Sequence, residues 1–73
     1  MKVIWILRDG GLGRTHGVYS SQVKARAAAQ YLLERWGVTN MEHSMGNNLE
    51  LFWINESRVD VAQYIVIEKD HLQ

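Results

Sequence analysis

Three segments of the chain are apolar on both faces of an extended strand, whereas only one segment has a helical pattern. Residues 2–8, 49–55 and 59–68 all place large apolar side chains at consecutive positions. A strand of this kind is usually covered on both of its faces. One helix can cover only one face of a sheet, and this mismatch constrains the fold more than any other feature.

The helical segment extends over residues 20–37. A serine at position 20 or 21 can cap its first turn, and the glycine at position 37 stands where helices commonly end. At about 100° per residue, one face collects Ala25, Ala28, Ala29, Leu32 and Trp36. Arg26, Gln30 and Glu34 lie on the opposite face, which we predict to be exposed to solvent.

The rest of the chain predicts extended structure and turns. Residues 17–20 look extended, residues 41–45 are typical of either a loop or a short edge strand, and residues 55–58 predict a polar turn. We therefore predict a single α+β domain over residues 1–73, with one helix packed on a mainly antiparallel sheet of about four strands, ββαββ. Residues 69–73 are expected to fray.

Composition excludes several functional classes. Eight basic and eight acidic side chains cancel, so no net charge draws the chain to nucleic acid or to an anionic membrane. The absence of cysteine removes disulfides and thiolate chemistry. The apolar run at residues 3–7 is far shorter than the roughly 20 residues that span a bilayer. These features favour a cytoplasmic protein without a membrane partner.

The glycine-rich stretch at residues 9–17 invites comparison with phosphate-binding loops. Neither the Gly-x-Gly-x-x-Gly spacing nor a Gly-Lys-Ser/Thr motif is present, and the predicted helix begins too late for its amide groups to meet a phosphate. We interpret the stretch as a mobile hairpin loop. The alternative is a loop that contacts a ligand or partner through Arg14 and His16.

The sequence contains no recognisable catalytic or metal-binding motif. His16, His43 and His71 do not fall at a metal-ligand spacing, and no cysteine is available as a nucleophile. We therefore expect no catalytic residues, no metal and no cofactor, and we expect that the protein is not an enzyme.

The first half of the chain carries a short motif. The opening segment at residues 2–7 is followed by the stretch GVYSS at residues 17–21 and by an alanine-rich helix that contains Lys24. In this outline the chain resembles a group of very small bacterial and phage proteins that share the same strand-to-helix junction. The resemblance implies no activity and no functional residues.

The leftover sheet face predicts a protein-binding surface. Depending on which face the helix covers, this surface contains either Val3, Trp5 and Leu7 with Leu51 and Trp53, or Ile4 and Ile6 with Phe52 and Ile54. An exposed apolar face of several hundred square ångströms normally marks an interface. Self-association as a homodimer covers such a face most simply. The alternative is that loops at residues 10–17 and 38–48 fold over it.

The functional hypothesis is therefore an accessory or regulatory protein-binding module that self-associates or binds another protein. The residues that we assign to partner binding are Trp5, Arg14, His16, Leu51, Trp53 and Tyr64. A small nucleic-acid-binding protein is the alternative, since arginines and aromatic side chains can combine phosphate contacts with base stacking. No basic cluster exceeds two residues, which disfavours this alternative.

Overall fold

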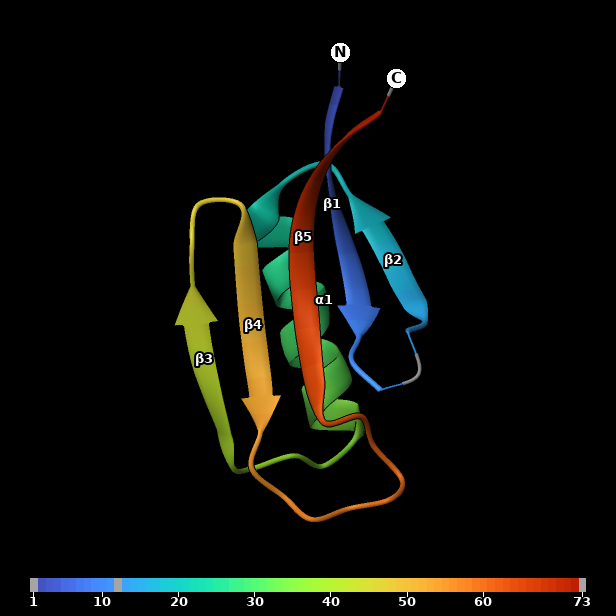
Figure 1. Ribbon diagram of the computed structural model, residues 1–73, viewed down its shortest axis with the longest axis vertical. Helices are drawn as coiled ribbons and strands as arrows, with labels where there is room; N and C mark the ends of the chain where they lie inside the picture. The colour runs from blue at the N-terminus through green and yellow to red at the C-terminus, as the bar shows by residue number, and fades with distance from the viewer. Residues whose placement is uncertain (1, 12, 73) are drawn as a thin grey trace.

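The computed structural model describes residues 2–11 and 13–72, which form one helix and one five-stranded sheet (Figure 1). The elements follow the order β1 (Lys2–Asp9), β2 (Thr15–Tyr19), α1 (Gln22–Arg35), β3 (Met41–Met45), β4 (Leu49–Ile54) and β5 (Tyr64–Leu72). The strands lie in the order β2-β1-β5-β4-β3, and every neighbouring pair is antiparallel. The last strand therefore lies at the centre of the sheet, between β1 and β4.

The predicted α+β class and the single helix on an antiparallel sheet are confirmed, but the strand count was too low. Residues 41–45 form β3, one of the two edge strands. The predicted strand at residues 59–68 was wrong at both ends, because residues 55–63 form a loop and β5 continues to Leu72. Pairing with β1 along its whole length, from Lys2↔Leu72 to Asp9↔Ile65, keeps the tail in the sheet through residue 72. Residue 73 of the tail that was expected to fray lies outside the described residues.

Local capping fixes both ends of α1. Ser21 is the N-cap residue, and its Oγ accepts a hydrogen bond from the Lys24 amide at 3.2 Å. Gly37 has φ +69°, a left-handed conformation that ends the helix, and the Val38 amide donates back to the Leu33 carbonyl at 3.0 Å. The helix thus begins two residues after the predicted segment begins and ends two residues before its end.

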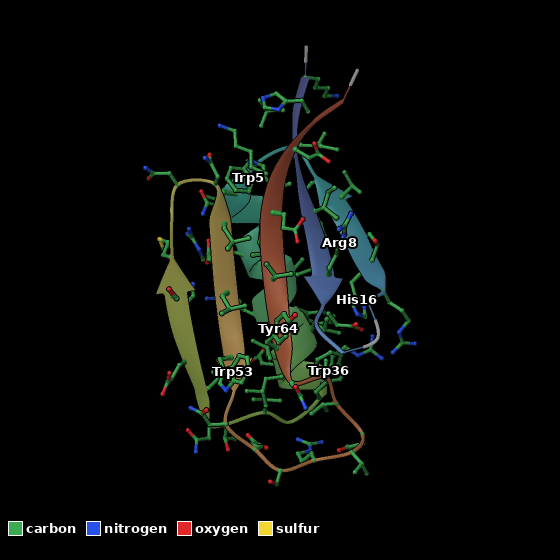
Figure 2. The ribbon with its side chains drawn as sticks, in the orientation of Figure 1. Trp5, Arg8, His16, Trp36, Trp53 and Tyr64 are labelled. Carbon is green, nitrogen blue, oxygen red and sulfur yellow. The ribbon has the colours of Figure 1, made fainter. Side chains whose placement is uncertain are left out.

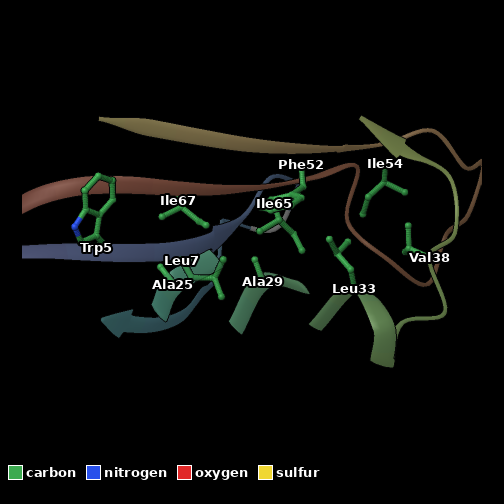
Figure 3. Close-up of a cluster of buried hydrophobic side chains, with 10 residues drawn as sticks. All are labelled: Trp5, Leu7, Ala25, Ala29, Leu33, Val38, Phe52, Ile54, Ile65 and Ile67. Carbon is green, nitrogen blue, oxygen red and sulfur yellow. The ribbon is translucent and has the colours of Figure 1, made fainter. Parts of the chain in front are cut away.

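The hydrophobic core lies between α1 and one face of the sheet (Figure 3). Ala25 and Ala29 are fully buried, so the helix backbone lies close to the strands. Leu33 is buried as well, although it stands outside the apolar stripe that the helical pattern predicts. The core consists of Trp5, Leu7, Ala25, Ala29, Leu33, Val38, Phe52, Ile54, Ile65 and Ile67.

Both predicted pairings of apolar faces were wrong, although the alternation within each strand is confirmed. The register pairs Leu7 and Glu50 with the same residue of β5, Ile67, so Leu7 and Glu50 point to the same face. Trp5 and Leu7 therefore share the core with Phe52 and Ile54 rather than with Leu51 and Trp53. β1 and β4 each pair with β5 and not with each other. Which face of β1 lies on the same side as a given face of β4 therefore depends on both registers with β5, and the pattern within each strand does not determine these registers.

Replacement of Ala29 by leucine tests how closely α1 packs on the sheet. Ala29→Leu inserts three carbon atoms into a fully buried position and should lower the free energy of unfolding by about 1–3 kcal/mol. Ala27 lies on the same helix and is exposed, so Ala27→Leu is the matched control and should change stability by less than about 0.5 kcal/mol. Urea denaturation measures both values. Equal effects at the two positions would contradict the packing described.

Candidate interaction surface

The sheet face opposite α1, which we call the uncovered face, is largely apolar. The register places the even-numbered residues of β1 on this face together with Leu51 of β4 and Val66 of β5. Its apolar side chains are Ile4, Ile6, Val18, Leu49, Leu51, Trp53, Tyr64 and Val66. In Figure 1 this face is turned toward the viewer, α1 lies behind the sheet, and the connecting loops lie at the two ends of the sheet.

Several of these side chains are open to solvent. Val18, Leu49 and Trp53 are 55%, 51% and 42% exposed, whereas Ile6, which lies between β2 and β5, is only 9% exposed. Large apolar side chains that stay in water forgo roughly 1.5–3 kcal/mol each relative to full burial. The sequence allows the loops at residues 10–17 and 38–48 to cover this face, but these exposures show that it remains accessible.

Trp53 and Tyr64 form an aromatic pair at one end of the uncovered face (Figure 2). Their rings are stacked with centroids 5.5 Å apart and planes 8° apart. The Tyr64 ring also lies directly over Gly10, where a Cβ atom would come within 2.1 Å of it. The Gly10 amide donates to the Tyr64 carbonyl at 2.7 Å. The glycine that follows β1 therefore allows Tyr64 to lie flat beside Trp53.

The uncovered face has one ion pair near its middle and polar residues along its edges. Arg8 and Glu68 lie 3.6 Å apart, and their side chains are 42% and 39% exposed. Thr15 on β2 and Glu42 and Ser44 on β3 occupy the two edges of the same face. A largely apolar surface bordered by polar residues is a common composition of a protein–protein interface.

The structure brings together three of the six residues that the sequence assigned to partner binding. Leu51, Trp53 and Tyr64 lie on the uncovered face. Trp5 lies on the opposite face and is 8% exposed within the core. Arg14 and His16 lie at the turn between β1 and β2 and in β2 itself, away from this group.

His16 points inward and binds a buried carboxylate that sequence reasoning missed. The register between β1 and β2 shifts so that Arg8 pairs with Thr15 and Leu7 with Gly17, which leaves His16 as an extra residue. Its Nε2 lies 2.7 Å from Oδ2 of Asp9, whose side chain is 1% exposed. The His16 ring also packs edge-on against Trp36, with centroids 6.0 Å apart.

A second buried carboxylate, Glu50, lies at the other side of the core. Arg26 donates to both of its oxygens, at 2.7 and 3.1 Å, Gln22 donates at 2.8 Å, and His43 also bonds to it. The prediction that Arg26 lies on a solvated helix face was therefore wrong. Glu50 shares a strand face with Phe52 and Ile54, and this signal could have indicated an inward-pointing charge that needs partners.

Hydrogen bonds determine the ionisation of both buried carboxylates. Burial alone would raise the pKa of Glu50, but the bonds from Arg26, Gln22 and His43 outweigh it and hold the pKa below its ordinary value of 4.5. For Asp9, burial is likewise outweighed by the bonds from His16 and the Arg14 amide, so its pKa lies below 3.8. Both carboxylates are therefore charged at neutral pH.

Comparisons with protein-family models, with curated proteins and with solved structures found no match. Within residues 2–11 and 13–72, no group of three or more histidine, aspartate or glutamate side chains is placed to hold a metal ion. No helix in the described part of the chain has the length and apolar character needed to cross a membrane.

Removal of the charge of Glu50 should weaken the fold at neutral pH. Glu50→Gln breaks charge-assisted hydrogen bonds to Arg26 in a buried site, so we expect a loss of about 2–4 kcal/mol in the free energy of unfolding at pH 7. Because folding lowers the pKa of Glu50, its contribution is complete above pH 4.5 and is lost as the pH falls below that value. The variant should therefore lose less stability than the wild type between pH 5 and pH 3.

Urea denaturation at several pH values measures this difference. Glu42→Gln, which removes a carboxylate from an exposed position on β3, is the control and should follow the wild type at every pH. A Glu50→Gln variant that follows the same curve as Glu42→Gln would show that the buried network does not stabilise the fold.

Proposed function

We propose that the protein is a non-enzymatic accessory or regulatory module that self-associates through its uncovered face. The observation that supports this most is the largely apolar character of that face, with Leu49 and Trp53 about half exposed and no element of the described chain packed over them. Trp and Tyr are also the residue types that contribute most to binding energy at interfaces, and Trp53 and Tyr64 lie side by side here.

The size of the uncovered face fits a reversible dimer. Five strands spaced by about 4.8 Å, with a length of about 20 Å, give it an area of about 480 Å² in projection. Standard interfaces bury about 800 Å² of accessible surface per partner, and transient ones bury less than about 600 Å². A second copy that covers this face therefore forms an interface near the lower limit, and the dimer should dissociate on dilution.

The charges on the uncovered face are compatible with a second copy. Arg8 and Glu68 put one exposed cation and one exposed anion near its centre, so neither sign dominates. In a two-fold dimer each copy offers the other the same pair of opposite charges. A partner with a strong net charge would instead meet one like charge near the centre of the interface.

The nucleic-acid alternative receives little support from the arrangement of arginines. Carboxylates pair with Arg8, Arg14, Arg26 and Arg58. Arginines neutralised in this way contribute little to the binding of phosphates, which depends on the release of counterions by unpaired cations. The arrangement of charges therefore supports self-association more than nucleic-acid binding.

Charges introduced on the uncovered face should abolish the dimer. The double variant Leu49→Lys, Trp53→Lys changes two exposed positions and places two cations inside the proposed interface. The wild type should change from a monomer of 8.4 kDa toward twice that mass between about 10 µM and about 1 mM. The double variant should stay monomeric over the same range in sedimentation equilibrium.

The matched control carries the same change in charge on the outer face of α1. Val23→Lys, Tyr31→Lys also replaces one aliphatic and one aromatic side chain at exposed positions, and it should dimerise like the wild type. A wild-type chain that remains monomeric up to about 1 mM would contradict self-association. Equal behaviour of the two double variants would contradict the assignment to the uncovered face.

A further inference from the structure

A small hollow between β2 and the second half of α1 combines several hydrogen-bond donors with an apolar floor. Its volume is about 160 Å³, and it is lined by Leu7, His16, Tyr19, Ala28, Tyr31, Leu32 and Arg35. It lies on the helix side of the sheet, so binding there does not depend on the uncovered face. Leu7, Ala28 and Leu32 supply the apolar part of its wall.

The charge of the hollow is positive. No aspartate or glutamate lines it. Arg35 forms no ion pair within residues 2–11 and 13–72, and its guanidinium lies 5.9 Å from the centre of the Tyr31 ring. The nearest buried carboxylate, Asp9, is already bound by His16 and the Arg14 amide. An anion in the hollow would therefore meet a cation that no carboxylate neutralises.

The polar side chains of the hollow suit a tetrahedral oxyanion better than a carboxylate. Arg35 offers a planar set of N–H donors, and Tyr19 and Tyr31 each offer a hydroxyl. A carboxylate has only two oxygens, whereas a phosphoryl group has three that can accept from donors on different sides.

We propose that this hollow binds the phosphoryl group of a small molecule, with Arg35 and the hydroxyls of Tyr19 and Tyr31 as its donors. A phosphate monoester can place its apolar part against Leu7, Ala28 and Leu32, whereas free phosphate uses the polar side alone. Both ligands contain the phosphoryl group that the donors would bind. The apolar wall favours the ester over free phosphate, because only the ester has an apolar part to pack against it.

NMR titration of the full chain with phenyl phosphate tests the proposal. Saturable shifts should appear at His16, Tyr19, Tyr31 and Arg35, with an apparent Kd of about 1 mM or below. Arg35→Gln should weaken binding by at least about tenfold, because it removes the charged donor. Tyr31→Phe, which keeps the ring but removes the hydroxyl, should weaken binding by a smaller factor.

Lys24→Gln is the control, because Lys24 is an exposed cation near the other end of the same helix, and this variant should bind like the wild type. Inorganic phosphate distinguishes the two sources of the phosphoryl group: weaker binding than phenyl phosphate identifies an ester, and equal binding identifies the free ion. The absence of saturable shifts up to about 20 mM would overturn the proposal. Equal binding of uncharged phenol, or equal loss in Arg35→Gln and Lys24→Gln, would overturn it as well.

Discussion

The structure depends on how one helix of 14 residues meets a sheet of five strands that is apolar on both sides. Ala25 and Ala29 let α1 lie close to the sheet, so a thin layer of Trp5, Leu7 and the side chains of β4 and β5 is enough to close the core. No element within residues 2–11 and 13–72 covers the other side in the same way. The fold therefore has one sealed face and one accessible apolar face, and the proposed function follows from that asymmetry.

Two buried carboxylates hold the sealed face together at its margins. Glu50 links β4 to α1 through Arg26 and to β3 through His43, while Asp9 links β1 to β2 through His16. Each carboxylate is satisfied by several donors, which offsets the cost of removing its charge from water. These bonds attach both edge strands to the rest of the molecule. The edges of the sheet, and with them the rim of the uncovered face, are thereby fixed in position.

The sequence predicted the helix, the alternation within each strand and the presence of a second apolar face, because each depends on local periodicity. It did not predict which strand faces belong together, since that depends on the register of β5 against both β1 and β4. Trp5 was consequently assigned to the wrong side. The inward position of His16 depends on a β-bulge, and the role of Arg26 depends on its distance from Glu50, 24 positions along the chain. Neither feature has a local sequence signal.

Isotope-filtered NMR on an equimolar mixture of labelled and unlabelled chain at about 1 mM tests the central claim most directly. The claim predicts intermolecular contacts that involve the methyl groups of Leu51 and Val66 and the ring of Trp53, with none from Ala25, Ala29 or Leu33, which α1 buries in the core. An absence of intermolecular contacts, or contacts confined to the outer face of α1 at Val23 and Ala27, would contradict it.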